Sequence, residues 1–223
     1  MLKLLGHYMS PYTRRVAVSL HVLGIPFELV ELSVIQQPER VRPHNPVLRI
    51  PTVVMDDGEP LLESGAILDE IDQIAGPARA LVPSNGASRR RVMQTTALAI
   101  ASMEKVQWGY YERRFRPPEK VHEPWIEHNN GQAVGGLLRL DAMAAAVPPS
   151  GWLAGTAAMT QADITAAVVT SWVREGRPEL KLETQAPSLC RFAERCEALA
   201  AFKAAPMPKS EAGRPGVYIP RSG

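Results

Sequence analysis

The fold is decided by residues 2–32, which read LKLLGHYMSPYTRRVAVSLHVLGIPFELVEL. Residues 2–8, which include Leu2, Leu4 and Leu5, predict a buried strand. Residues 10–23 predict a helix, because a capping serine is followed by proline and then by apolar residues at helical spacing. Gly24 and Pro26 end this helix, and residues 27–32 predict a second strand. Strand, helix and strand in this order form a βαβ unit with a right-handed crossover.

The next segment predicts two further strands and a helix. A polar loop with a short, irregular helix is expected at 36–45, and a third strand at 50–55. The turn signal Asp56-Asp57-Gly58 leads to a short fourth strand at 61–62. A helix then begins at Ser64 and places Ile67, Ile71 and Ile74 on one face, until Gly76-Pro77 ends it. The fold class expected here is α/β, with parallel and antiparallel strands in one sheet.

The rest of the chain predicts helices alone. Apolar residues recur every three or four positions in four segments: 89–115, 124–147 (loosened by Gly135-Gly136), 160–174 and 188–200, the last with Leu199 inward. The domain organisation expected is 1–78 as the α/β domain, 79–88 as a linker, 89–205 as an all-helical domain, and 206–223 as an extended tail.

Composition excludes several classes of protein. The chain has 223 residues, 45% of them hydrophobic, and a formal net charge of +2. This charge provides neither the basic surface of a nucleic-acid-binding protein nor a polybasic membrane anchor. No apolar run approaches the roughly 18 residues of a membrane span. Cys190 and Cys196 imply no disulfide framework, and the histidines lack metal-ligand spacing, so we expect a cytoplasmic protein without a metal.

Ser10 is the first candidate functional residue. At a helix N-terminus, unpaired N–H groups and the positive end of the helix dipole favour an anion. A thiolate held there has a pKa below that of a free thiol, and a serine hydroxyl donates a hydrogen bond to it. The alternative interpretation is an ordinary helix cap.

Two further segments carry patterns suited to a peptide ligand. Arg49-Ile50-Pro51-Thr52 opens a strand with proline, and the preceding residue can pair its backbone with an extended peptide. Glu63-Ser64 joins an acid to a hydroxyl at a helix start. This pair suits an amino acid head group, with the carboxylate facing the α-amine and the hydroxyl facing the α-carboxylate. Each pattern also fits a purely structural role.

Taken together, these stretches resemble the N-terminal domain of cytosolic glutathione transferases. The resemblance rests on four motifs in order: SPYTRRV at 10–16, LGIPFE at 23–28, NPVLRIPTVV at 45–54 and LLESGAILDEI at 61–71. The C-terminal half adds GWLAG at 151–155. Thr160 and Asp163 are similar to the family's helix-capping motif and are expected to serve folding. The resemblance implies a thioredoxin-like βαβ-ββα domain followed by an all-helical domain, of the bacterial type with a serine active site.

The resemblance also implies roles for single residues. Ser10 stabilises the thiolate of glutathione, with Tyr8 as the alternative because a phenol also donates a hydrogen bond. Glutathione-binding roles fall to five residues: Arg49 toward the glycyl carboxylate, Ile50 through its backbone, Pro51 as a cis-proline, and Glu63 and Ser64 at the γ-glutamyl group. A serine at position 10 argues against thiol-transferase chemistry, because serine forms no mixed disulfide.

The function expected is conjugation of glutathione, as co-substrate, to apolar electrophiles. Trp108, Tyr111 and Phe115, at i, i+3 and i+7 of the long helix, and Tyr12 are the candidates for the electrophile site, which the family places between the domains. The resemblance further implies a homodimer and a role in detoxification. Two alternatives stay open: a glutathione-dependent isomerase or dehalogenase on the same scaffold, and a non-catalytic binding protein.

Overall fold

The computed structural model describes residues 1–208, which form two compact units. The first unit contains Met1–Arg90 and Cys196–Pro208, and the second contains Arg91–Arg195. The predicted tail therefore lies mostly outside the described residues, since 209–223 are not described.

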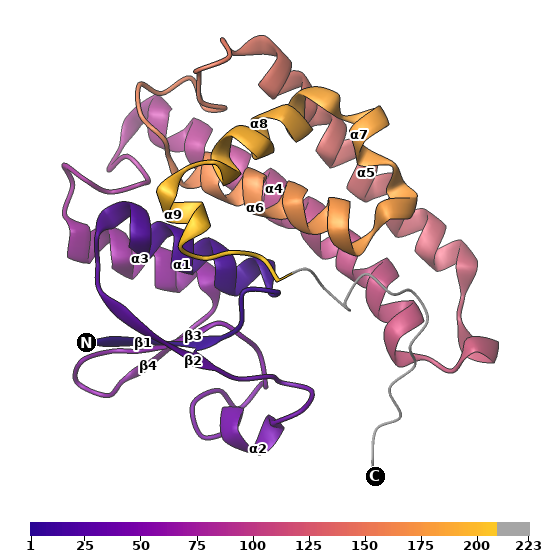
Figure 1. Ribbon diagram of the computed structural model, residues 1–223, viewed down its shortest axis with the longest axis horizontal. Coiled ribbons are helices and arrows are strands. Elements are labelled where there is room, and N and C mark those ends of the chain that lie inside the picture. Colours follow the sequence, from indigo (N-terminus) through magenta and orange to yellow (C-terminus); the bar gives the residue numbers. More distant parts are fainter. Residues whose placement is uncertain (209–223) are drawn as a thin grey trace. The chain divides into compact units, whose positions relative to one another are not determined.

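The first unit is built on a four-stranded mixed sheet in the order β2-β1-β3-β4. β1 and β2 are parallel, whereas β3 is antiparallel to both β1 and β4. Helices α1 and α3 cover one face and α2 lies on the other (Figure 1). This arrangement confirms the predicted fold class. Its elements are β1 (Leu2–Gly6), α1 (Pro11–Leu23), β2 (Phe27–Glu31), α2 (Pro38–Val41), β3 (Thr52–Val54), β4 (Pro60–Leu62) and α3 (Ser64–Ala75).

The sheet buries apolar side chains on both faces. Leu4 and its neighbour Val53 on β3 are 0% and 1% exposed. Leu5, which points to the opposite face because side chains alternate along a strand, packs in a cluster with Leu32 and with Val41 of α2. Burial on both faces explains why β1 is a nearly continuous apolar run. Ile67 and Ile71 of α3 are buried, whereas Ile74 near the end of the helix is 45% exposed.

The segment after residue 195 packs on α1. Arg14, 1% exposed, donates through Nη1 and Nη2 to the two carboxylate oxygens of Glu197, each at 2.6 Å. Its Nε donates to the carbonyl oxygen of Ala205 at 2.8 Å, and its guanidinium carbon lies 5.9 Å from the ring centre of Phe202. Phe202 belongs to α9 (Ala200–Lys203) and is fully buried. Arg14 of α1 therefore contacts this C-terminal segment through an ion pair, a hydrogen bond and the Phe202 ring.

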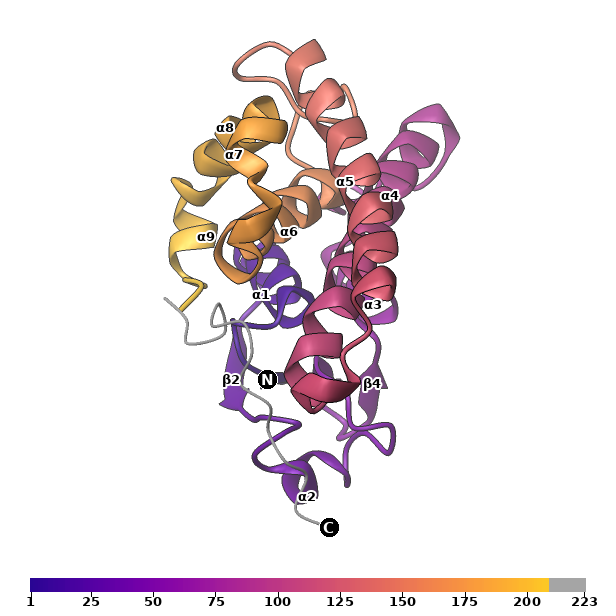
Figure 2. The same ribbon diagram turned by 90° about the vertical axis from the view of Figure 1, so that its right-hand side faces the viewer.

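The regular elements of the second unit are all helices within its described residues, as predicted. α4 and α5 run side by side (Figure 2), and a Cβ added at Gly136 of α5 would lie 3.2 Å from Cβ of Ser102 on α4. Gly135-Gly136 does not interrupt α5, which corrects the expectation that this pair loosens the helix; Gly136 instead permits close packing. The elements are α4 (Gly86–Phe115, which begins in the first unit), η1 (Pro118–Lys120), α5 (Glu123–Ala146), α6 (Gln161–Gly176), η2 (Pro178–Leu180), α7 (Leu182–Gln185) and α8 (Pro187–Glu197).

Helix α6 is the core of the second unit, with residues 161–170 all buried. A capping box fixes its start: the Asp163 carboxylate accepts hydrogen bonds from the backbone N–H and the hydroxyl of Thr160, at 2.8 and 2.7 Å. Asp163 also accepts from the N–H of Leu153 at 2.8 Å. The folding role predicted for Thr160 and Asp163 is thereby confirmed. The prediction that Leu199 points inward was wrong: it is 36% exposed, because α8 ends at Glu197 and Leu199 lies in the break before α9.

Candidate active site

Ser10 occupies the N-cap of α1. Its hydroxyl oxygen accepts from the N–H of Thr13 at 3.3 Å, and its carbonyl oxygen accepts from the N–H of Arg14 at 2.9 Å. Pro11 follows in the first turn, as expected from its fixed backbone angle. Because a hydroxyl accepts and donates independently, the cap leaves the Ser10 proton available for a ligand. The cap and a thiolate-binding role are therefore compatible at this residue.

Gly6 lets the end of β1 lie close to the first turn of α1, because it has no side chain. Its φ of +144° favours glycine, and a Cβ there would lie 2.6 Å from Oγ1 of Thr13 and 3.3 Å from Cβ of Ile50. The end of β1, the first turn of α1 and the loop before β3 consequently come close together. The strand ends at Gly6 rather than at Tyr8, and the carbonyl of His7 accepts from the N–H of Ser10 at 3.0 Å in the turn that follows.

Tyr8 lies in that turn and is half-buried. Burial, and secondly the negative charge of Glu31, raise the pKa of its phenol above the usual value. The phenol therefore stays protonated at neutral pH and has an O–H to donate. The geometry leaves Tyr8 as a chemically competent alternative to Ser10.

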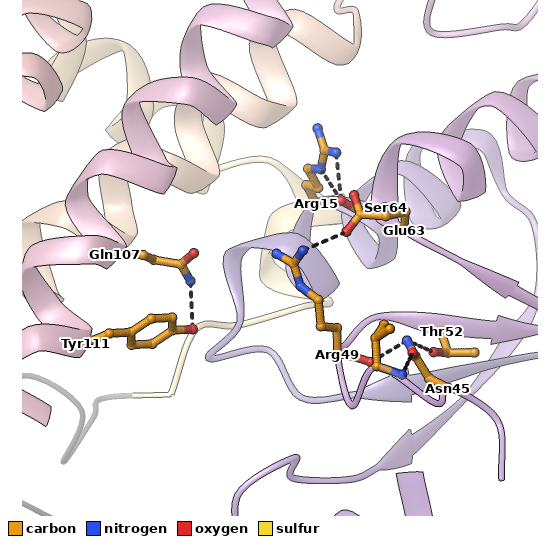
Figure 3. A network of polar contacts seen from close by, with 9 residues as sticks. Arg15, Asn45, Arg49, Thr52, Glu63, Ser64, Gln107 and Tyr111 are labelled. Atoms are coloured by element: carbon orange, nitrogen blue, oxygen red, sulfur yellow. Dashed lines mark hydrogen bonds and ion pairs between the residues drawn. The ribbon is translucent and has the colours of Figure 1, made fainter. Parts of the chain in front are cut away.

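The loop before β3 is shaped by Asn45 (Figure 3). The Ile50–Pro51 peptide bond is cis, as the resemblance implies. Asn45, 1% exposed, donates from Nδ2 to the carbonyl oxygen of Arg49 at 2.9 Å and to Oγ1 of Thr52 at 3.2 Å. The registers of β3 with both neighbours begin at Thr52, so Ile50 lies outside both ladders. Sequence reasoning missed Asn45; its signal was the Asn-Pro dipeptide at the start of the motif.

Glu63 and Arg49, both predicted site residues, are brought together. Glu63 precedes α3 with φ of 68° and ψ of 124°, a conformation that residues other than glycine rarely adopt. Its carboxylate is exposed and lies 3.8 Å from Nη1 of Arg49. Non-glycine residues held in such conformations cluster at functional sites. No side chain caps the N-terminus of α3, so its first N–H groups remain available to an anion.

Ser64, the first residue of α3, is 1% exposed and contacts Arg15 (Figure 3). Arg15 donates to the Ser64 hydroxyl oxygen from Nη2 at 2.7 Å and from Nε at 3.3 Å. Burial lowers the pKa of Arg15 to about 10, an effect that Tyr12 and Glu63 partly oppose. The guanidinium is thus still a cation at neutral pH. Sequence reasoning missed Arg15, although it stands within the motif at 10–16.

The aromatic candidates fall in both units. Tyr12, in the first, is buried at 8% exposure, whereas Trp108 and Tyr111 of α4, in the second, are 54% and 41% exposed. The Tyr111 and Phe115 rings lie 5.2 Å apart, and Tyr111 accepts a hydrogen bond from Gln107 at 3.3 Å (Figure 3). Trp108 and Tyr111 thus form the exposed part of the predicted stripe, and the electrophile site built on these residues stays a prediction.

Residues 1–208 contain neither a cluster of metal ligands nor a membrane-spanning helix. No group of three or more His, Cys, Asp or Glu side chains in this range is arranged to hold a metal ion. None of the helices described there has the length and apolar character needed to cross a membrane.

Comparisons with known proteins agree with this geometry. Residues 4–79 match the family model for the glutathione S-transferase N-terminal domain. Glutathione S-transferase U4 of Arabidopsis thaliana is 39% identical over 72 residues, 32% of either chain, so the match spans about a third of that relative. Maleylacetoacetate isomerase of Pseudomonas aeruginosa is 26% identical over 69% of this chain and 73% of its own.

A solved structure extends the likeness to nearly the whole chain. The glutathione S-transferase of Methylobacillus flagellatus, with glutathione bound, has a TM-score of 0.84 and 27% identity over 92% of this chain and 98% of that one. The family model and the solved structure thus agree on the fold. Residues 4–79 match the N-terminal domain of glutathione S-transferases, and the chain has the fold of a solved glutathione S-transferase.

Proposed function

We propose that this chain is a glutathione transferase that conjugates the glutathione thiolate to apolar electrophiles. The observation that carries the proposal is the Ser10 hydroxyl at the N-terminus of α1, whose oxygen caps the helix and whose proton remains available. A hydrogen bond to the sulfur, together with the helix dipole, stabilises the thiolate over the thiol. One pKa unit corresponds to about 1.4 kcal/mol, within the range of one hydrogen bond to a charged group.

In this proposal glutathione binds to the first unit, which contacts its cysteinyl, γ-glutamyl and glycyl parts. The backbone of Ile50, outside both ladders of β3, pairs with the cysteinyl residue as a further strand would. Glu63 and Ser64 receive the γ-glutamyl amine and carboxylate, and Arg49 receives the glycyl carboxylate. The glutathione-bound structure of the Methylobacillus relative supports this ligand.

Replacing Ser10 with alanine is expected to lower kcat/KM for conjugation of a chloronitrobenzene by about tenfold or more, and to raise the apparent thiol pKa in the pH–rate profile by about one unit. Tyr8→Phe is expected to keep most of the activity. Steady-state rates over a pH series measure both effects, at temperatures well below unfolding because the lost cap itself costs about 1 kcal/mol.

Ser33→Ala is the matched control for the Ser10 experiment. The Ser33 hydroxyl accepts from the N–H groups of Ile35 and Gln36 in an exposed turn of the same unit, so its loss removes a similar local contact elsewhere. This variant is expected to retain the wild-type rate and thiol pKa. Full activity in Ser10→Ala combined with loss of activity in Tyr8→Phe would transfer the role to Tyr8.

A second candidate is glutathione-dependent isomerisation. It is favoured by the similarity to maleylacetoacetate isomerase over 69% of this chain. The two reactions differ in their use of thiol: conjugation consumes one glutathione per turnover, whereas isomerisation returns it. Incubation with maleylacetoacetate, with chloronitrobenzene and with haloalkanes, followed by thiol titration and product analysis, separates a transferase from an isomerase or dehalogenase.

The predicted homodimer and role in detoxification belong to the same proposal and rest on the resemblance, whereas the predicted cytoplasmic location rests on cysteine usage and composition. Sedimentation velocity measures the oligomeric state directly. A protein that fails to bind a glutathione resin and shows no thermal shift with glutathione would instead be the non-catalytic relative.

A further inference from the structure

Two consecutive arginines of α1 are both buried but have unlike partners. Arg14 is paired with a carboxylate. Arg15, 5% exposed, donates only to the neutral hydroxyl of Ser64, and no carboxylate within residues 1–208 lies at ion-pair distance from it. A buried guanidinium ordinarily has an anionic partner, because desolvation of its charge is costly. Glu63 acts on Arg15 only from beyond ion-pair distance, so the position of a contacting anion beside Arg15 suits a ligand.

The hydrogen bonds at Ser64 define where such an anion binds. A serine hydroxyl has two acceptor lone pairs and one proton. Nη2 and Nε of Arg15 both donate to the Ser64 oxygen, so the lone pairs are occupied and the hydroxyl acts as a donor. Within the described residues no acceptor takes that proton. The uncapped N–H groups at the start of α3 lie next to it in the chain.

We propose that Arg15 is a positioning residue that makes the γ-glutamyl site select a free α-carboxylate. It fixes the Ser64 hydroxyl as a donor, and it supplies a buried positive charge behind that hydroxyl. The inference rests on the proposed function and deepens it, because it assigns the charge selectivity of the site to a residue of α1. A ligand with a neutral α-carboxamide meets the same donors but leaves the buried charge unmatched.

The experiment compares two ligands by isothermal titration calorimetry. One is glutathione, and the other is glutathione with its γ-glutamyl α-carboxylate converted to the primary amide. The wild-type protein is expected to bind glutathione on the order of 30-fold more tightly than the amide. In Arg15→Gln this ratio is expected to fall to about threefold or less, mainly through weaker binding of glutathione. Loss of fold alone would weaken both ligands equally and leave the ratio unchanged.

Arg79→Gln is the matched control, because Arg79 also belongs to the first unit and donates only to neutral acceptors, the carbonyls of Ala75 and Leu23. It is expected to keep the wild-type ratio. If Arg15→Gln does not fold, Arg15→Lys serves: it keeps the charge but lacks the planar pair of N–H donors, so the ratio is expected to fall several-fold. An unchanged ratio in Arg15→Lys, or in a folded Arg15→Gln, overturns the proposal.

Failure of the inference is distinguishable from failure of the proposed function. A wild-type protein that binds both ligands equally well has a glutathione site without the selectivity assigned to Arg15. A wild-type protein that binds neither ligand has no glutathione site, and the proposed function fails with it.

Discussion

Replacing Glu197 with alanine is expected to lower the free energy of unfolding by about 3–5 kcal/mol. The reason is Arg14, whose side chain is 1% exposed and whose Nη1 and Nη2 each lie 2.6 Å from a Glu197 carboxylate oxygen. Without Glu197 the buried cation keeps the Ala205 carbonyl but no carboxylate. Because the Glu197 side chain is 31% exposed, water can enter the space that alanine leaves. We therefore expect a change in the lower half of this free-energy range. Urea denaturation measures the change.

Glu194→Ala is the control for this prediction. Glu194 also pairs with an arginine, Arg174, but its side chain is 57% exposed, and such surface pairs contribute about 1 kcal/mol or less. The double variant Arg14→Met with Glu197→Ala is expected to recover much of the loss, because it also removes the buried charge. If Glu197→Ala and Glu194→Ala lowered the free energy of unfolding equally, burial of Arg14 would not strengthen its ion pair, and the prediction would be wrong.

Replacing Asp163 with alanine is expected to lower the free energy of unfolding by about 3–5 kcal/mol. Its carboxylate is fully buried and accepts from the N–H of Leu153 and from both the N–H and the hydroxyl of Thr160. Alanine leaves these three donors without an acceptor at the start of the core helix α6. Thermal and urea unfolding measure the loss.

Thr160→Ala is the control, because it removes only the hydroxyl. It is expected to lower the free energy of unfolding by about 1–2 kcal/mol. A larger decrease in Thr160→Ala than in Asp163→Ala would contradict the prediction.

The stability contribution of Asp163 is also expected to depend on pH. Burial raises the pKa of its carboxyl above the usual value, against the hydrogen bonds from Thr160 and Leu153 that lower it. A raised folded-state pKa means that the folded protein binds the proton more tightly than the unfolded chain does. This contribution is fully present below the unfolded pKa of about 4 and is lost as pH rises through the folded pKa.

Asp163→Asn isolates this pH dependence, because asparagine does not titrate. The free energy of unfolding of the wild type, relative to this variant, is expected to fall as pH rises above about 4 and then to level off. Urea titrations at several pH values measure the difference. If this relative free energy of unfolding instead rose over the same pH range, the hydrogen bonds would lower the pKa of Asp163 more than burial raises it.

Local patterns in the sequence were sufficient for features that depend on neighbouring residues. The cap at Ser10 and the capping box of Thr160 with Asp163 each involve residues three positions apart. The error at Leu199 arose because the apolar periodicity continues beyond Glu197, where α8 ends. The prediction for Gly136 was wrong because this glycine permits α5 to pack closely against α4, and it does not loosen the helix.

Long-range partners were beyond the reach of such patterns. Arg14 and Arg15 are adjacent in sequence and chemically identical, yet their partners lie 183 and 49 residues away. Which arginine meets which partner follows from the rotation of about 100° per residue along α1, together with the packing of α3 and the C-terminal segment. The family motifs located Glu63, Ser64 and Pro51, but they gave no role to the arginine behind Ser64.

The central claim is that the first unit binds glutathione at Glu63 and Ser64. It is tested most directly by titrating glutathione into the wild-type protein and into Glu63→Gln in a calorimeter. The account predicts saturable binding to the wild type in the range of about 1 µM to 1 mM, and binding that is weaker by about tenfold or more in Glu63→Gln. Absence of binding to the wild type at millimolar glutathione, or equal affinity in both proteins, would contradict it.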